Sequence, residues 1–331
     1  MRDNDFEASF ELISMLADGK IHSGRELAVA LGVSRAAVWK RIGKLAGLGV
    51  DVVKVRSLGY KLPKPIEFLD VALLQKNLST VIPGKAVSVE VVKQVDSTNL
   101  ALLRRERSTE ESAVTCLLAE QQTSGRGRRG KTWHSPLGEN VYLSILWQTQ
   151  LSLDKLNGLS LALGVVIATV LSEVFGINAQ LKWPNDVLVK NKKIAGILVE
   201  VDGALEGPLR VVVGLGLNVT TEHETTEPNG HNWTSVRAQS ERNASRTDVA
   251  LNVMSGLLLA LHEFERLGFR AFRQRWIALD AYAGMPVQIT SHEHSHTGLN
   301  RGVDENGALV LDVDGVLHTI SSGEVSLRVR A

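Results

Sequence analysis

The sequence predicts an α+β chain in three parts: an N-terminal winged helix-turn-helix, a central mixed α/β domain and a C-terminal small SH3-like β-barrel. Short amphipathic helices occupy the first sixty residues, strands and helices alternate through the middle, and only short β-runs divided by glycines follow. We place the domains at 1–65, 66–283 and 284–331. A chain of 331 residues is long enough for two or three domains with their own cores.

The N-terminal helices are marked by their ends. Apolar residues recur at helical spacing over 6–17, and Gly19 follows where a glycine commonly ends a helix. Ser23 and Glu26 have the spacing of a capping box and predict the start of a second helix, and Ser34 predicts the start of a third. Two helices joined by a turn that contains glycine form a helix-turn-helix.

The third helix turns Val38, Ile42 and Leu45 inward and presents small and basic residues on its other face. Residues 51–55 and 60–62 then predict the two strands of a β-wing. A basic helix face beside a wing favours DNA binding. Trp39 lies on the same face, where its ring could cover the protein, touch DNA or meet a partner. The residues expected at the DNA interface are Gly24, Ser34, Arg35, Ala36, Trp39, Lys40 and Gly43.

Charge is distributed unevenly along the chain. The formal net charge of +1 alone gives no reason to expect a nucleic-acid binder. Residues 1–61 hold ten basic and seven acidic side chains, giving +3, and within them residues 20–61 hold nine basic and two acidic ones, giving +7. The remaining 270 residues therefore sum to −2. Basic charge on the predicted recognition helix and wing favours phosphate contacts, and a module used only for packing or dimerisation is the alternative.

Pro63 and Pro65 mark the start of the central domain, because prolines disfavour helix and stiffen a short connection. Hairpin-like spacing around Asn191 and Lys192 favours a mixed sheet over a doubly wound parallel one. Expected helices begin at Asn99 and span 159–171, 248–267 and 271–279. Expected strands span 87–92, 114–120, 141–148, 180–183, 187–189, 194–201 and 209–219. The apolar helix over 159–171 is shorter than the roughly 20 residues of a membrane span, so we expect it in the core.

The single cysteine, Cys116, lies in an apolar run and is expected to be a small buried hydrophobic residue. It can form no intrachain disulfide, and the polar, acidic start of the chain does not have the pattern of a secretory signal. These features predict a cytoplasmic protein with no membrane partner. His292, His294 and His296 alternate along one predicted strand, where an exposed hairpin is expected and a metal site is the alternative, so no protein-held metal is predicted.

The segment 121–133, Gln-Gln-Thr-Ser-Gly-Arg-Gly-Arg-Arg-Gly-Lys-Thr-Trp, is the most unusual part of the chain. Its three glycines let the backbone approach a ligand and move. Its basic residues, which suit a phosphate or an acyl-phosphate, are Arg126, Arg128, Arg129 and Lys131. There is no Walker Gly-Lys-Ser/Thr, and no Rossmann GxGxxG opens a helix here. An RNA-binding tract or an incidental basic loop is the alternative.

Three further segments could line one site. Residues 182–186, Lys-Trp-Pro-Asn-Asp, predict a turn across which Lys182 and Lys193 could converge on an anion. Residues 214–218, Gly-Leu-Gly-Leu-Asn, end a valine-rich strand in small residues and an amide. Residues 96–99, Asp-Ser-Thr-Asn, have the composition of a helix N-terminus, which can bind a polar ligand. An ordinary turn, a β-bulge and a helix cap are the respective alternatives.

In their order along the chain, the four segments resemble the biotin protein ligases. The helix-turn-helix in front of them resembles the bifunctional kind of ligase that is also the biotin operon repressor. The resemblance extends over essentially the whole chain, to Gly-Glu-Val-Ser-Leu-Arg at 323–328. It implies that biotin and ATP, with Mg²⁺, form biotinyl-5′-AMP, and that the biotin carboxyl carrier protein of acetyl-CoA carboxylase receives the biotin on a lysine. It also implies that biotinyl-5′-AMP is the corepressor, and that the adenylate-bound homodimer binds biotin operator DNA.

The same resemblance implies roles for individual residues. Those that match biotin contacts are Ser97, Thr98, Asn99, Gln122, Arg126, Gly127, Arg128, Trp133 and Lys193. Those that match ATP or adenylate contacts are Arg126, Arg128, Arg129, Lys182, Asn185, Asn218 and Trp233, the last as a cover for adenine. Arg128, Lys193 and Lys182 are expected to act in catalysis. The alternatives are a ligase that does not bind an operator, a lipoate ligase, and a non-enzymatic sensor of a nucleotide-like effector. The neutral polar side chains of Ser97, Asn99 and Gln122 favour biotin over lipoate, because biotin has an uncharged ureido ring.

Overall fold

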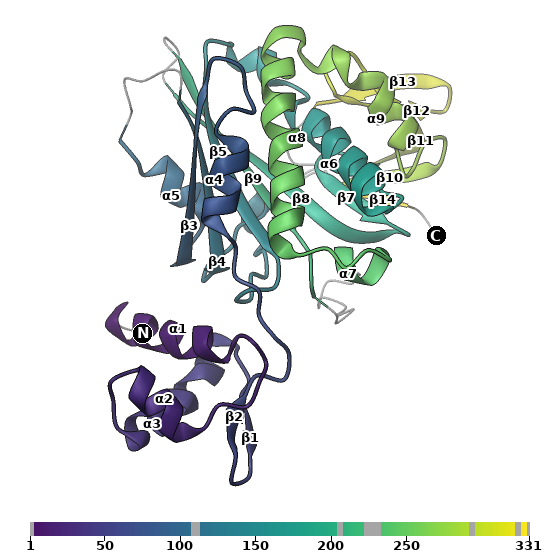
Figure 1. Cartoon of the computed structure of the whole chain (residues 1–331). Coiled ribbons are helices and arrows are strands. Elements are labelled where there is room, and N and C mark those ends of the chain that lie inside the picture. Colours follow the sequence, from purple (N-terminus) through teal and green to yellow (C-terminus); the bar gives the residue numbers. More distant parts are fainter. Residues whose placement is uncertain are drawn as a thin grey trace.

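The computed structural model describes residues 3–106, 113–203, 208–221, 233–290, 295–321 and 326–329. Figure 1 shows an N-terminal lobe, connected by an extended segment to a larger α/β domain, and a small sheet that packs at the C-terminal side of that domain. The predicted α+β class with a helix-turn-helix in front is confirmed.

The N-terminal lobe forms as its caps predict. Its elements are α1 (Asp3–Leu16), α2 (Gly24–Ala30), α3 (Arg35–Leu45), the 3-10 turn η1 (Ala46–Leu48), β1 (Val53–Val55) and β2 (Gly59–Lys61). The Ser23 hydroxyl accepts from Glu26 N at 3.1 Å and the Glu26 carboxylate accepts from Ser23 N at 2.9 Å, which confirms the capping box. Ser34 accepts from Ala37 N at 3.2 Å at the start of α3. β1 and β2 pair antiparallel as the wing.

A seven-stranded mixed sheet forms the central domain, in the order β3-β4-β5-β9-β8-β7-β6. Its strands are β3 (Ala86–Val95), β4 (Ala113–Gln122), β5 (Val141–Thr149), β6 (Gln180–Lys182), β7 (Asp186–Val189), β8 (Lys192–Asp202) and β9 (Leu209–Leu217). Only the pair β3 and β4 is parallel among the described strands, and the other pairs are antiparallel. The expected mixed sheet is confirmed.

The helices of the central domain follow the predicted order, with one addition. They are α4 (Val71–Leu78), α5 (Thr98–Leu103), α6 (Leu159–Phe175), α7 (Val236–Gln239), α8 (Arg246–Leu267) and α9 (Arg273–Leu279), with 3-10 turns η2 (Arg128–Gly130), η3 (Leu153–Leu156) and η4 (Phe269–Ala271). The sequence analysis did not predict α4, which Asp70 caps by accepting from Leu73 N at 2.9 Å. In Figure 1, α6 and α8 cross the same face of the sheet.

The apolar helix is an element of the core, as expected. Together with the 3-10 turn in front of it, Leu153–Phe175 is long and apolar enough to cross a membrane by length and composition alone. In the folded chain ten of the seventeen residues of α6 are buried. They join a core that also contains side chains of the sheet, of α8 and of the C-terminal sheet. Cys116 is buried in the same core, and burial raises the pKa of its thiol to about 12.

The C-terminal part is a five-stranded antiparallel sheet in the order β13-β12-β11-β10-β14. Its strands are β10 (Pro286–Thr290), β11 (Ser295–Val303), β12 (Leu309–Val313), β13 (Val316–Ile320) and β14 (Ser326–Val329). Trp183, in the turn of the central domain, donates from Nε1 to Gly307 O at 3.0 Å and ties this sheet to the domain. His296 is exposed on β11, while His292 and His294 lie outside the described residues. Within the described ranges no three His, Cys, Asp or Glu side chains cluster as metal ligands.

Candidate functional site

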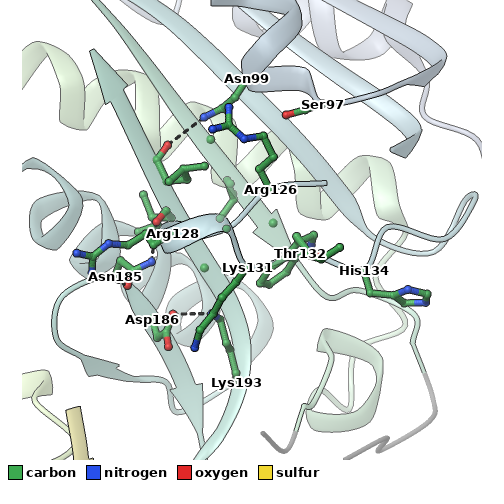
Figure 2. Close-up of a pocket in the computed structure, with 18 of the residues that line it drawn as sticks. Ser97, Asn99, Arg126, Arg128, Lys131, Thr132, His134, Asn185, Asp186 and Lys193 are labelled. Carbon is green, nitrogen blue, oxygen red and sulfur yellow. Dashed lines mark hydrogen bonds and ion pairs between the residues drawn. The ribbon is translucent and has the colours of Figure 1, made fainter. Parts of the chain in front are cut away.

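One pocket of about 560 Å³ gathers the predicted ligand residues. All fourteen residues expected to contact biotin, ATP or the adenylate line it, although they come from segments more than 130 positions apart along the chain. Figure 2 shows Ser97, Asn99 and Arg126 toward one end of the pocket, and Asn185, Asp186 and Lys193 toward the other. The site therefore has a neutral polar end and a cationic end.

Glycines in β8 and β9 form the floor of the pocket. A Cβ added to Gly216 would lie 2.2 Å from Trp133 Cε2, and one added to Gly214 would lie 2.3 Å from Asn99 Oδ1. Glycine is therefore required at both positions for the indole and the amide to lie against the sheet. The third predicted segment, 214–218, is thus part of the site, and Asn218 at its end donates from Nδ2 to Thr234 O at 3.1 Å.

The neutral polar end is an interlocked hydrogen-bond network. Thr98 donates from both its backbone N and its hydroxyl to Gln122 Oε1, at 2.9 and 3.1 Å. The buried Ser144 hydroxyl lies 2.7 Å from Thr98 Oγ1 and 2.5 Å from Asn99 Oδ1. Gln122 Nε2 donates to Ser135 Oγ at 3.0 Å. These contacts fix the orientation of each side chain before a ligand binds.

Ser97 differs from its neighbours in this network. It stands at the N-cap of α5, yet its side chain makes no capping hydrogen bond, so the capping alternative does not account for this residue. Ser97 is 2% exposed and lines the pocket, and its hydroxyl has no partner among the described residues. A buried hydroxyl that is not hydrogen-bonded to protein is available to a polar ligand group.

The glycine- and arginine-rich segment folds over the pocket as a tight hairpin. Trp133 N donates to Gly125 O at 2.9 Å, Gly127 N donates to Lys131 O at 2.7 Å, and Arg129 at the turn has a φ of 58°. Arg128 approaches Asn185 Oδ1 at 3.4 Å. Burial first and the neighbouring Arg129 second lower the pKa of the Arg128 guanidinium, against the opposing effect of Asp186.

The cationic end is arranged around Lys193. Its ammonium lies 2.6 Å from Asp186 Oδ1 and 5.2 Å from the centre of the Trp133 ring. Trp233 pairs with Lys193 as an isolated parallel bridge and stacks on His134 with ring centres 6.1 Å apart. The buried Trp133 Nε1 has no hydrogen-bond partner within the described part of the chain. Residues 222–232, which precede Trp233, lie outside the described residues.

A β-bulge explains how Lys193 reaches the pocket. Ala195 pairs with Val187 and Lys193 pairs with Leu188, so β8 contains one extra residue, Ile194, which is fully buried. Because a bulge changes which side of the strand the following residues face, Lys193 points to the same side as Gly196. A Cβ on Gly196 would accordingly lie 3.0 Å from Lys193 Nζ.

The sequence analysis assigned no role to several residues of the site. Ser144 could have been noticed, because it is a lone hydroxyl in the apolar run 141–147. Asp186 stood in the segment 182–186 and Glu200 in the expected strand 194–201, but nothing in the sequence indicated their partners. Ser135 and His134 carry no pattern that distinguishes them from ordinary loop residues.

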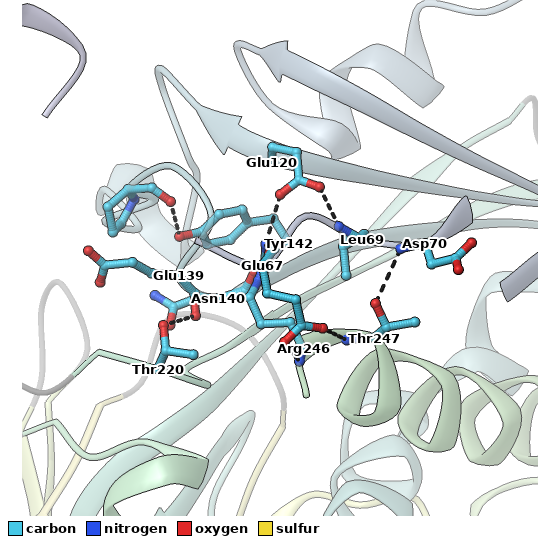
Figure 3. A network of polar contacts seen from close by, with 11 residues as sticks. Glu67, Leu69, Asp70, Glu120, Glu139, Asn140, Tyr142, Thr220, Arg246 and Thr247 are labelled. Carbon is cyan, nitrogen blue, oxygen red and sulfur yellow. Dashed lines mark hydrogen bonds and ion pairs between the residues drawn. The ribbon is translucent and has the colours of Figure 1, made fainter. Parts of the chain in front are cut away.

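A second polar network joins the connection between the lobes to the segment that leads to Trp233 (Figure 3). The fully buried Arg246 donates to Glu67 O at 2.5 Å, to Glu120 Oε2 at 2.8 Å and to Asn140 O at 2.9 Å. Asn140 Oδ1 in turn accepts from Val219 N at 2.9 Å. The segment after β9 is therefore anchored to the same buried arginine as the interdomain connection.

The predicted DNA face is exposed on the N-terminal lobe. Arg35, Ala36, Lys40 and Gly43 are exposed on α3, and Trp39 is 66% exposed. Two residues of the predicted set have other contacts in this structure. Gly24 is half-buried, and a Cβ added to it would lie 3.5 Å from the Tyr60 ring. The Ser34 hydroxyl caps α3.

Comparisons with known proteins match all three parts of the chain. Residues 91–218 match the Biotin/lipoate A/B protein ligase family, residues 9–61 match an HTH domain, and residues 283–328 match the Biotin protein ligase C terminal domain.

Individual relatives cover either nearly the whole chain or about three quarters of it. The chain is 37% identical to the bifunctional ligase/repressor BirA of Escherichia coli (strain K12), over 99% of both chains. It is 31% identical to the biotin--[acetyl-CoA-carboxylase] ligase of Mycobacterium tuberculosis, over 72% of this chain and 88% of that protein. The solved structure of biotin protein ligase from Aquifex aeolicus in complex with biotin and ATP is 30% identical, with a TM-score of 0.63, and covers 73% of this chain and 99% of that one.

Proposed function

This chain belongs to the biotin protein ligase family and is a biotin–protein ligase with a helix-turn-helix repressor domain. On that premise we propose that it activates biotin with ATP to biotinyl-5′-AMP and transfers biotin to one lysine of the biotin carboxyl carrier protein of acetyl-CoA carboxylase. We also propose that the adenylate-bound protein dimerises on biotin operator DNA and represses the biotin biosynthesis operon. A cytoplasmic location is part of this proposal.

The polarity of the pocket is the observation that carries the proposal. Biotin presents an uncharged ureido ring at one end and a carboxylate at the other. The pocket places the free Ser97 hydroxyl and the network around Gln122 at one end, and Lys193 and Arg128 at the other. Neutral donors and acceptors suit the ureido ring, and cations suit the carboxylate and the nucleotide phosphates. Lipoate has no ureido ring to occupy the first end.

In the first step a carboxylate oxygen of biotin attacks the α-phosphorus of ATP. The bond from that phosphorus to the bridging oxygen breaks, and pyrophosphate leaves. We assign Lys193, Arg128 and Lys182 to hold the carboxylate and the phosphates in line and to stabilise the charge that develops between them. The remaining residues assigned to ATP or the adenylate are Arg126, Arg129, Asn185, Asn218 and Trp233, with the Trp233 ring as the cover for adenine.

In the second step the ε-amine of the carrier lysine attacks the acyl carbon, AMP leaves and the amine loses a proton. No nucleophilic side chain of the ligase is required. The hairpin over the pocket, with Trp133 beneath it, shields the acyl-adenylate from water until the carrier arrives.

Magnesium fits this site as an ion that arrives with the nucleotide. Asn185 and Asp186 offer oxygen atoms beside the cationic end, and Mg²⁺ is commonly held by one or two such groups together with substrate phosphates. When bound it would neutralise charge on the phosphates.

A pyrophosphate-exchange assay tests the enzyme proposal. We expect incorporation of labelled pyrophosphate into ATP that depends on biotin, and its loss in Lys193→Met. The exposed Lys155→Met serves as the matched control and should exchange like the wild type. Exchange without biotin, or with lipoate in its place, would contradict the proposal.

A footprint of the biotin operator tests the repressor proposal. Protection is expected only when biotin and ATP are both present, because the lobe of net charge +3 binds weakly alone and gains affinity from pairing. Arg35→Ala with Lys40→Ala should abolish protection while pyrophosphate exchange is retained. Protection that does not depend on biotin would contradict the corepressor role, and sedimentation with and without the adenylate measures the dimer.

A further inference from the structure

Glu200 on β8 joins two parts of the pocket without lining it. Its Oε2 accepts from Asn99 Nδ2 at 2.8 Å, and its Oε1 lies 3.1 Å from Arg126 Nη1. Asn99 belongs to α5 and Arg126 to the hairpin over the pocket, so one carboxylate contacts two separate elements of the site.

The amide of Asn99 is saturated by protein on its donor side. Nδ2 donates to Glu200 and, at 3.3 Å, to Leu198 O, while Oδ1 accepts from Ser144. Both amide hydrogens are thereby used, which leaves only one lone pair of Oδ1 for another partner. The side chain is 4% exposed, so its orientation is set by these contacts and Glu200 supplies the charged one.

The Glu200 carboxylate also forms an ion pair with Arg126, in the first half of the hairpin. Arg126 is 42% exposed in its side chain and Glu200 is 22% exposed, so solvent screens this ion pair only partly. Releasing Arg126 would therefore remove the ion pair that ties the hairpin to β8 at this end of the pocket.

We infer that Glu200 is a positioning residue for the adenylation site: its carboxylate orients the Asn99 amide and holds the Arg126 hairpin closed over the bound acyl-adenylate. This inference rests on the proposed function. Glu200 does not line the pocket, so it acts through Asn99 and Arg126. It therefore controls how long the adenylate is retained more than how fast it forms.

The variant Glu200→Gln separates the two contacts. The amide oxygen can still accept from Asn99, but the neutral side chain cannot form an ion pair with Arg126. The dissociation rate of biotinyl-5′-AMP and the KM for biotin are expected to rise roughly twofold to fivefold, in line with a partly screened charge pair, while the kcat for pyrophosphate exchange changes by less than about twofold. Arg126→Gln breaks the same pair from its exposed side, and because Arg126 is also assigned to the ligand it should raise the dissociation rate at least as much.

Two further measurements distinguish positioning from a general loss of structure. The double variant Glu200→Gln with Arg126→Gln should release the adenylate no faster than Arg126→Gln alone, because Arg126→Gln has already removed the interaction that Glu200→Gln breaks. The difference between wild type and Glu200→Gln should shrink as salt is raised. Glu90→Gln is the matched control. It breaks the ion pair between Glu90 on β3 and Arg105, which lies outside the pocket, and should leave the dissociation rate of the adenylate unchanged.

The outcomes separate this inference from the function on which it rests. A wild-type protein without biotin-dependent exchange would overturn the proposed function. A wild-type protein that exchanges, beside a Glu200→Gln protein with the same adenylate dissociation rate, would overturn only the inference. Additive effects of Glu200→Gln and Arg126→Gln would overturn it as well.

Discussion

Gly216 shows how a single residue determines the shape of the pocket. The Trp133 indole lies so close to its Cα that any Cβ would overlap the ring. We expect Gly216→Val to displace the indole and to weaken biotin binding roughly tenfold or more, because overpacking typically costs about 1–3 kcal/mol. Calorimetric titration with biotin measures the change. Gly47→Ala, at a position with open space around its Cα, is the control. An unchanged affinity for Gly216→Val would show that the indole does not form part of the biotin site.

Asp280 is a buried carboxyl between the central domain and the C-terminal sheet. It accepts from Asn300 Nδ2 at 2.7 Å and from Tyr282 N at 3.0 Å, yet burial raises its pKa above the ordinary 3.8. The folded chain thus holds this proton more tightly than the unfolded chain. The contribution of Asp280 to the free energy of unfolding is most favourable below the ordinary pKa, and it falls as pH rises through the raised pKa.

Urea denaturation of wild type and Asp280→Asn across this pH range tests that assignment. The difference in unfolding free energy between the two proteins should change with pH from about 4 upward and become constant above the raised pKa. A difference that does not vary with pH would mean that the Asp280 pKa is the same in the folded and unfolded chain.

At the scale of elements, α3 depends on its cap. The Ser34 hydroxyl accepts a hydrogen bond from Ala37 N, which has no acceptor within the first turn of the helix. Ser34→Ala should destabilise the N-terminal lobe by about 1 kcal/mol and weaken operator binding, since α3 presents the exposed basic face. Thermal unfolding followed by circular dichroism and a gel-shift titration measure the two effects.

Ser172→Ala is the control for that change. Ser172 is exposed on α6, where alanine is at least as good a helix former as serine. Operator binding by Ser34→Ala that equals the wild type would show that the cap does not position the recognition helix.

For the whole molecule, Arg246 connects the lobes through its buried contacts. Its guanidinium bonds to the connection at Glu67, to Glu120 on β4 and to Asn140, and it is fully buried. Arg246→Met would leave the buried Glu120 carboxylate without its cation, at a cost of about 3–5 kcal/mol. We expect a lower midpoint of chemical denaturation and faster proteolysis of the connection around residues 63–70.

The double variant Arg246→Met with Glu120→Gln should recover part of the lost stability, because it removes the unpaired charge. Arg242→Met, which removes an exposed side chain that contacts Val174 O and lies over the Phe175 ring, is the control. Stability of Arg246→Met equal to that of Arg242→Met would contradict the assignment of Arg246 as the central residue of this network.

The lobes also meet directly, and the sequence gives no sign of this. Leu137, from the central domain, packs into the core of the N-terminal lobe, and Gln121 Nε2 donates to Leu48 O at 3.2 Å. Gln121 is followed by Gln122, whose side chain belongs to the ligand network. Successive side chains of a strand point to opposite faces, so the end of β4 touches the N-terminal lobe on one side and the pocket on the other.

Local chemistry determined much of this protein from the sequence by itself. Helix starts at Ser23 and Ser34 follow from capping rules that involve neighbours three residues away, and the strands follow from runs of apolar residues. The roles of the fourteen ligand residues came from the resemblance to the biotin protein ligases, and the pocket brings all of them together. The helix α4 was not predicted, because its packing against α8 and β3 is not visible in a short window of sequence.

Only the tertiary structure decided which side chains support the site. The bulge at Ile194 turns Lys193 toward the pocket. Glu200 gains its role from Asn99, which lies 101 positions earlier in the chain, and from Arg126, which lies 74 positions earlier. Such contacts depend on strand register and on the closing of long loops, which no local pattern specifies. The physical reason is that capping and periodicity act over one or two turns of chain, whereas the orientation of a buried polar group is set by partners that only folding brings near.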